Sequence, residues 1–178
     1  MYTENSKSPS GFSLGLDIGS TTAKAVLRRD EEIVFERYER HFSRVREKTA
    51  ELLALIKQIT GTAYIDTAIS GSAGLGLAEA ADIPFVQEVF ATGEVVKKLE
   101  PDTSCVIELG GEDAKIIFFD GGIDERMNGS CAGGTGAFID QMATLLNISV
   151  DELDKLSLNA GRLYPIASRC GVFAKTDI

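Results

Sequence analysis

Three strand-like runs joined by very short connections constrain the fold of this chain more than any other feature. The runs cover residues 12–18, 23–28 and 33–40. Connections this short cannot hold a crossover, so these strands are expected to pair as an antiparallel meander. An amphipathic helix at residues 45–59 and another strand at 63–69 follow. The pattern therefore predicts an α/β fold.

The rest of the chain continues with strands and helices. Strands are predicted at 104–109, 114–119 and 123–127, with Asp120-Gly121-Gly122 as the turn between the last two. We expect helices at 75–81, at 88–99, from the segment after Cys131 to about residue 147, and at 150–158. Residues 84–87 are predicted to be a brief extended piece. Residues 1–11 are polar and are expected to form a flexible tail.

Composition narrows the functional classes. The net charge of −9 argues against nucleic-acid binding and against attachment to an anionic membrane, because both favour clustered lysine and arginine. No apolar run is long enough to span a bilayer, and the N-terminus lacks the pattern of a signal peptide. Three scattered cysteines are too few for a disulfide framework, so a reducing, cytoplasmic location is expected.

The first candidate site is the loop that joins the first two strands. It reads Asp17-Ile-Gly-Ser-Thr-Thr-Ala-Lys24, with an acid near the strand end, a glycine and three hydroxyl side chains. Backbone N–H groups of such a turn can bind a phosphate, and the acid can hold Mg²⁺ through water. An ordinary polar hairpin is the alternative interpretation of this motif.

A second loop has the same order of residue types. It reads Glu108-Leu-Gly-Gly-Glu-Asp-Ala-Lys115, with an acid, an apolar residue, a glycine and a polar loop before the next strand. Two such loops can hold a polyphosphate and its metal from two sides. Asp113 or Glu112 can then orient an attacking water, since phosphoryl transfer depends mostly on positioning and electrostatics. For either acid taken singly, a solvated turn is the alternative.

Two cysteines form the third candidate site. Cys131 lies in a glycine-rich segment between a strand and a helix, and Cys170 stands between Arg169 and Gly171. A [4Fe–4S] cluster needs four thiolates, so two per chain predict one cluster shared across a two-fold axis. Zinc also accepts four thiolates, and ligand number does not choose between the metals. Cys105 is predicted to be a small core residue of a buried strand.

Together these motifs resemble the ATP-dependent activators of 2-hydroxyacyl-CoA dehydratases and the benzoyl-CoA reductase ATPase subunits, the BadF/BadG/BcrA/BcrD family. The matching segments are residues 14–24, 108–115, 128–138 and 168–174. The resemblance implies the ribonuclease-H-like fold of the actin, sugar-kinase and heat-shock-chaperone ATPases. We expect a mixed five-stranded sheet flanked by helices, an extra hairpin and a cysteine-bearing helix. Residues 12–178 would then be the first actin-like lobe of a longer protein that also has a second lobe.

The resemblance also implies roles for individual residues. It implies catalytic roles for Asp17, Glu108 and Asp113. It implies that ATP or ADP with Mg²⁺ contacts Gly19, Ser20, Thr21, Thr22, Lys24, Gly110 and Gly111. It makes Cys131 and Cys170 ligands of a [4Fe–4S] cluster that bridges a homodimer. Glu108 stands where many family members have aspartate, and Glu112 where many have glutamine.

The implied function is coupling of ATP hydrolysis to delivery of a low-potential electron to an acyl-CoA dehydratase or reductase. We expect ATPase activity in the longer protein and none in the isolated lobe. One alternative is a sugar- or acid-kinase-like phosphotransferase, and another is a non-catalytic nucleotide-sensing or assembly domain. The single histidine, His41, builds no Ser/His/Asp arrangement and is predicted to be structural or exposed.

Overall fold

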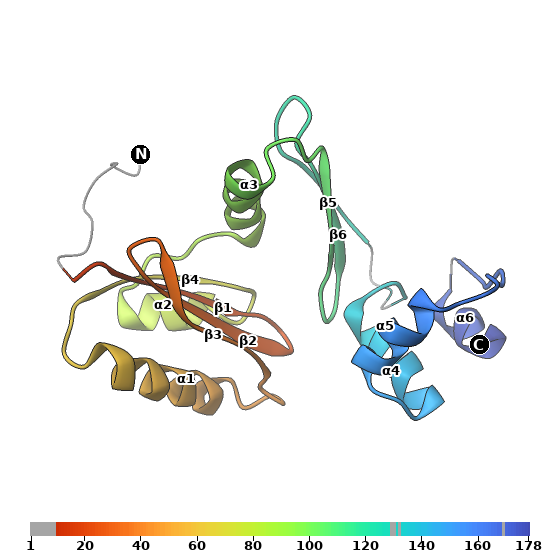
Figure 1. Cartoon of the computed structure of the whole chain (residues 1–178), viewed down its shortest axis with the longest axis horizontal. Coiled ribbons are helices and arrows are strands. Elements are labelled where there is room, and N and C mark those ends of the chain that lie inside the picture. The colour runs from red at the N-terminus through yellow and green to blue at the C-terminus, as the bar shows by residue number, and fades with distance from the viewer. Residues whose placement is uncertain (1–9, 129–130, 132, 169) are drawn as a thin grey trace. The chain divides into compact units, whose positions relative to one another are not determined.

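The first four strands form one mixed sheet in the order β3-β2-β1-β4 (Figure 1). Three of them pair antiparallel, as their short connections require, and the fourth lies parallel to β1. The predicted α/β class and the mixed sheet are therefore confirmed. The strands are β1 (Phe12–Ile18), β2 (Thr22–Arg29), β3 (Glu32–Arg40) and β4 (Ile65–Ser70).

This computed structural model describes residues 10–128, 131, 133–168 and 170–178. Most of the predicted flexible tail lies outside the described residues. The chain divides into two compact units, residues 1–94 and 95–178. The sequence-based assignment of residues 12–178 to one lobe stays a prediction.

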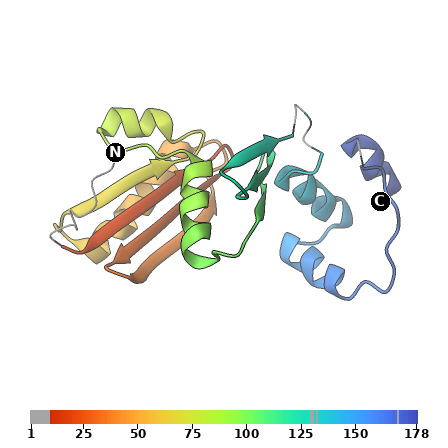
Figure 2. The same cartoon turned by 90° about the horizontal axis from the view of Figure 1, so that it is seen from above.

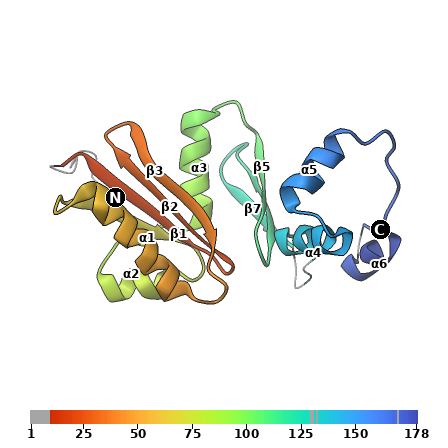
Figure 3. The same cartoon turned by 60° about the horizontal axis from the view of Figure 1, so that its bottom comes forward.

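Helices α1 (Val45–Thr60) and α2 (Leu75–Ala81) pack on the same face of the four-stranded sheet (Figure 3). Strand side chains alternate between faces, and the apolar residues of β1 and β2 occupy one face with this period of two. Leu52 and Ile56, one turn apart on α1, are each only 1% exposed and pack against that face. The core of the first unit consists of Phe12, Leu14, Leu16, Ile18, Ala23, Ala25, Leu27, Leu52, Ile56, Ile69 and Ala78.

The brief extended piece predicted at residues 84–87 forms a single bridge beside β4, and no fifth strand joins the sheet in the described residues. Phe85 pairs in parallel with Ile69 outside any named strand. The Ile69 N–H donates to the Pro84 carbonyl, and the Val86 N–H donates to the Ile69 carbonyl. The next bond of this ladder needs an N–H at position 84, which proline lacks. The predicted count of five strands is therefore wrong for the described residues.

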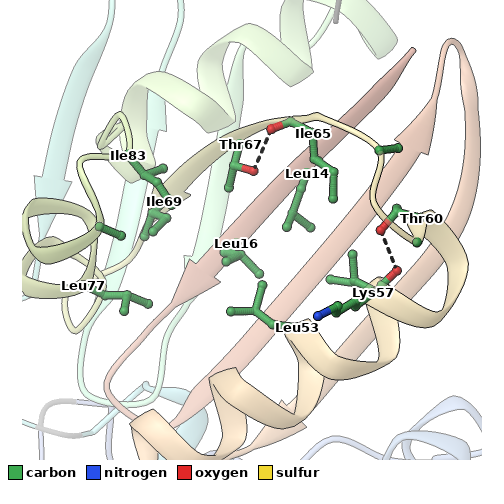
Figure 4. A pocket seen from close by; sticks show the side chains of 14 residues that line it. Leu14, Leu16, Leu53, Lys57, Thr60, Ile65, Thr67, Ile69, Leu77 and Ile83 are labelled. Atoms are coloured by element: carbon green, nitrogen blue, oxygen red, sulfur yellow. Dashed lines mark hydrogen bonds between the residues drawn. The ribbon is translucent and has the colours of Figure 1, made fainter. Parts of the chain in front are cut away.

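An apolar hollow of about 300 Å³ lies between α1, β1 and β4 (Figure 4). Leu14 and Leu16 of β1 and Leu53 of α1 are among its lining residues. Lys57 is the one charged residue among the fourteen described residues that line it. None of the predicted site residues lines it, so the hollow belongs to the packing of the core.

A three-stranded antiparallel sheet and three helices form most of the second unit (Figures 1 and 2). The order β5-β6-β7 follows the chain, so the predicted hairpin and the helix after Cys131 are confirmed. Helix α3 (Glu88–Leu99) contains the boundary between the units. The second unit contains β5 (Cys105–Leu109), β6 (Ala114–Phe118), β7 (Asp124–Met127), α4 (Gly136–Leu146), α5 (Val150–Leu158) and α6 (Gly171–Asp177).

Cys105 is exposed, so its prediction as a core residue is wrong. It begins β5, where the period of two places it on one side with Ile107 and Leu109. Ile107 is 65% exposed and Leu109 is 49% exposed. An apolar run does not by itself show which side of a strand is covered, and here this side is open.

No helix in the described part of the chain is long and apolar enough to cross a membrane.

The packing of α1 predicts a difference between two identical substitutions. Leu52→Ala empties a site that is 1% exposed, so the free energy of unfolding should fall by about 2–5 kcal/mol. Leu55→Ala, on the same helix but 38% exposed, should cost less than about 1 kcal/mol. Urea unfolding followed by circular dichroism measures both. Equal losses would contradict this account of the core.

Candidate functional site

The loop between β1 and β2 places an acid opposite a lysine. The strand register pairs Asp17 with Lys24, and Lys24 Nζ donates to Asp17 Oδ2 at 2.6 Å. Both side chains are about one third exposed, at 33% and 35%. The Gly19 N–H donates to the Thr22 carbonyl at 2.9 Å and closes the tight turn. The turn therefore brings the predicted residues 17–24 together at one end of the sheet.

The second oxygen of Asp17 is buried and has no hydrogen-bond partner among the described residues. It faces Gly71, just after β4, where an added Cβ would lie 2.6 Å from this oxygen. A buried, unpaired carboxylate oxygen is costly, and Mg²⁺ with its bound waters is a ligand of the right chemistry to satisfy it. Asp17 therefore fits the predicted metal-positioning role, with one oxygen held by Lys24 and the other free.

His41 holds the same loop through the backbone. It is 2% exposed, and its Nδ1 accepts from the Ser43 N–H at 3.1 Å. Its Nε2 must therefore carry the proton and donates to the Gly19 carbonyl at 3.0 Å. The His41 N–H also donates to the Thr21 carbonyl at 3.2 Å. The structural role predicted for His41 is confirmed, whereas its position on the loop was missed.

Two residues that follow His41 have an unusual backbone conformation. Phe42 and Ser43 have φ values of +47° and +63°, in the left-handed region that non-glycine residues rarely adopt. Such strain persists where surrounding contacts hold it. Here His41 supplies contacts on both sides, to the loop and to Ser43. No side-chain pattern could have identified this arrangement, because the partners of His41 in the loop are backbone carbonyls.

The second loop repeats the pairing of an acid with a lysine. The register places Glu108 opposite Lys115, whose Nζ lies 3.5 Å from Glu108 Oε1 and 3.7 Å from Asp113 Oδ2. An added Cβ on Gly110 would lie 2.6 Å from Asp113 Oδ1, so a larger residue there would displace the Asp113 carboxylate. Glu108, Gly110 and Asp113 therefore lie together around a buried lysine. Glu112 is exposed, as expected for a solvated turn.

Cys131 and Cys170 line the same hollow, which has a volume of about 440 Å³. Cys131 is exposed, Cys170 is half-buried, and both are free thiols. The Gly133 N–H donates to Cys131 Sγ at 3.4 Å. Arg169, the predicted positive neighbour of Cys170, lies outside the described residues. The structure thus brings both predicted metal ligands to one site.

Glycine backbones bring the two cysteine segments close to each other. An added Cβ on Gly133 would lie 3.2 Å from the Gly171 nitrogen and 3.4 Å from Cys131 Sγ. An added Cβ on Gly171 would lie 3.2 Å from Gly133 Cα. The described residues contain no group of three or more His, Cys, Asp or Glu placed to hold a metal ion. Two thiols at one hollow fit a thiolate-bound group that takes further ligands from outside the chain.

Asn128 is a second residue whose position the sequence interpretation missed. It follows β7, and its side chain contacts both the start of β6 and the cysteine segment. The sequence contains it within a matching segment but gives no sign of this double contact. Its partners, like those of His41, are backbone groups.

Comparison with known proteins finds a family whose sequence profile matches most of this chain. The sequence profile described as the BadF/BadG/BcrA/BcrD ATPase family matches residues 14–178. The chain is 30% identical over 171 residues to the 2-hydroxyisocaproyl-CoA dehydratase activator of Clostridioides difficile, covering 94% of this chain and 64% of that protein. It is 29% identical over 174 residues to a benzoyl-CoA reductase subunit from Thauera aromatica, covering 92% and 61%.

A solved structure supports the same assignment. The activator of the 2-hydroxyisocaproyl-CoA dehydratase from Clostridium difficile, with bound ADPNP, superposes with a TM-score of 0.76 at 31% identity. The match covers 93% of this chain and 63% of the other chain. The predicted actin-like ATPase fold class is confirmed. The chain spans less than two thirds of the length of these proteins.

The surroundings of Gly71 and Gly76 predict opposite effects when each is replaced by alanine. Gly71→Ala places a Cβ 2.3 Å from the Ile18 carbonyl oxygen at a φ of +92°, so it should lower the free energy of unfolding by more than about 1 kcal/mol. Gly76→Ala in α2 meets nothing within 4 Å and should raise it by about 0.5–1 kcal/mol. Thermal and urea unfolding measure both signs. A neutral Gly71→Ala would contradict the close contact.

Proposed function

Because the chain belongs to the BadF/BadG/BcrA/BcrD ATPase family, we propose that it is part of an ATP-dependent activator of an acyl-CoA dehydratase or reductase. The observation that carries this proposal is that Cys131 and Cys170 line one hollow. Nucleotide binding alone is common to many actin-like ATPases. Two cysteines at one hollow, in the same unit as the second loop, support an electron-transfer role in addition to nucleotide binding.

In this proposal the two loops bind the phosphates of ATP or ADP. The turn at residues 19–22 offers N–H and hydroxyl groups, and Lys24 keeps the Asp17 carboxylate oriented. Asp17 Oδ1 would hold a water of Mg²⁺. In the second loop, Gly110 and Gly111 would approach the phosphates, while Glu108 and Asp113 position the metal and the attacking water. Support comes from the ADPNP bound to the similar Clostridium difficile activator.

Cys131 and Cys170 would supply two of the four thiolates of a [4Fe–4S] cluster, and a second copy of the chain the other two. When bound, the cluster would serve as a low-potential one-electron carrier. The chain's own residues orient the ligands: Gly133 donates to Cys131 Sγ, and close packing against Gly171 keeps the two segments together. The electron acceptor would be an acyl-CoA dehydratase or a benzoyl-CoA-reductase-type enzyme, as the names of the relatives suggest.

The two alternative functions, a phosphotransferase and a nucleotide-sensing domain, give no reason for the two cysteines to lie at one site. A sugar- or acid-kinase-like phosphotransferase needs only the loops, and a nucleotide-sensing domain would keep the cysteine segments as packing turns. Cys131 is exposed, which a packing role does not require. The activator is therefore the function that these sites support best.

Anaerobic reconstitution with iron and sulfide tests the shared cluster. The chain should gain a broad absorption in the blue and about two iron atoms per chain, because four irons are divided between two copies. Cys131→Ser and Cys170→Ser should each lose this absorption. Cys105→Ser is the matched control, since Cys105 is exposed but lies on β5, and it should retain the absorption. Identical behaviour of all three variants would exclude the shared cluster.

Nucleotide titration of the protein tests the first loop. Asp17→Asn removes the charge that holds hydrated Mg²⁺, so the Kd for Mg-ADP should rise at least about tenfold. Its dependence on Mg²⁺ should also disappear. Asp82→Asn is the control, because Asp82 is exposed and asparagine accepts its left-handed backbone. Mg²⁺-dependent binding that survives Asp17→Asn would remove Asp17 from the metal site.

A further inference from the structure

A set of hydrogen bonds links the second loop to the segment that contains Cys131. We propose that Asn128 is a positioning residue that couples the conformation of the second loop to that of Cys131, with Gly136 as a parallel link. This inference rests on the proposed function only for the roles of the second loop in nucleotide binding and of Cys131 in cluster binding. The link itself consists of contacts within the second unit.

Asn128 uses both ends of its side-chain amide. Its Oδ1 accepts from the Ala114 N–H at 2.9 Å, and its Nδ2 donates to the Cys131 carbonyl at 2.8 Å. Only the oxygen can accept and only the nitrogen can donate, so the partners fix the orientation of the amide. The Asn128 N–H also donates to the Ala114 carbonyl at 2.9 Å. Both backbone polar groups of Ala114, the residue after Asp113, are therefore bound to Asn128.

Gly136 provides a second contact between the same two segments. Its N–H, at the first residue of α4, donates to the Gly110 carbonyl at 2.7 Å. An added Cβ on Gly136 would lie 3.0 Å from that carbonyl oxygen and 3.3 Å from the Leu109 oxygen. The start of α4 thus lies directly against the second loop. Phe138, on the first turn of α4, lines the hollow with both cysteines.

These contacts leave the second loop little freedom to move independently of Cys131. The Gly110 carbonyl accepts a hydrogen bond from the Gly136 N–H, and both backbone polar groups of Ala114 are bound to Asn128. A shift of the loop that moves Ala114 changes the position of the Asn128 amide, and with it the Cys131 carbonyl. A ligand that reorients the loop would therefore alter the position of the Cys131 thiol without touching it.

The alkylation rates of the three cysteines test this coupling in the protein before any iron is added. N-ethylmaleimide labelling followed by mass spectrometry gives a rate for each thiol. Gly110→Ala perturbs the second loop at Asp113, because the added Cβ would lie 2.6 Å from the Asp113 Oδ1 and 3.2 Å from its carbonyl oxygen. The rate at Cys131 should change by about threefold or more, while Cys105 should keep its rate and serve as the internal reference. Asp113→Asn is the milder perturbation if Gly110→Ala does not fold.

Asn128→Asp removes one half of the link. The carboxylate still accepts from the Ala114 N–H, but it cannot donate to the Cys131 carbonyl. In this background the Gly110→Ala or Asp113→Asn effect on the Cys131 rate should fall to half or less on a logarithmic scale. Asn159→Asp is the matched control, since its Nδ2 donates to the Lys155 carbonyl at 2.9 Å elsewhere in the unit. It should leave the effect unchanged.

Two results would overturn the inference. One is an alkylation rate at Cys131 that both Gly110→Ala and Asp113→Asn leave unchanged. The other is an effect of these substitutions on the Cys131 rate that is the same with and without Asn128→Asp. Iron incorporation is measured separately on the unsubstituted chain. Loss of coupling with normal iron uptake refutes the link alone, whereas coupling without iron uptake refutes the cluster alone.

Discussion

Pairing of a strand with its immediate successor is the constraint on which both loops depend. Across such a pair, opposite residues lie close enough for their side chains to interact, so an acid near the end of one strand meets a lysine at the start of the next. Asp17 and Lys24 meet in this way in the first unit, and Glu108 and Lys115 in the second. The lysine lies close to the carboxylate and helps to fix its orientation. The glycine between them then lets the turn stay tight.

Close backbone approach is the second physical theme of the molecule. Gly71 lies against Asp17, Gly136 against Gly110, and Gly133 against Gly171, each without room for a Cβ at ordinary distance. Where side chains are absent, hydrogen bonds from backbone groups and from His41 or Asn128 fix the geometry. The candidate sites are therefore built mainly from main-chain atoms, with few side chains to hold them.

The sequence predicted the elements well because their signals are local. The strand at 12–18 and the helices at 75–81, 88–99 and 150–158 have the predicted bounds, since periodicity and end signals lie within the elements themselves. The acids, glycines and cysteines of the three candidate sites were proposed because their residue types carry the chemistry, and the structure brings the members of each site close together. The sequence did not predict the open side of β5 or the double contacts of His41 and Asn128. Each of these depends on residues that are distant in the sequence. The segment beside β4 forms only one bridge, and Pro84 lacks the N–H that would extend this ladder toward the start of β4.

The unequal exposure of the two cysteines in the hollow has a consequence for how this protein would be oxidised on exposure to air. Cys131 is exposed, whereas Cys170 is half-buried at the start of α6. Oxidants attack accessible thiolates first, and oxidation beyond the sulfenic acid is generally irreversible. In the proposed cluster each chain supplies only two thiols, so the loss of Cys131 would inactivate the site while Cys170 is still intact. Tolerance of oxygen would then be set by a single exposed sulfur.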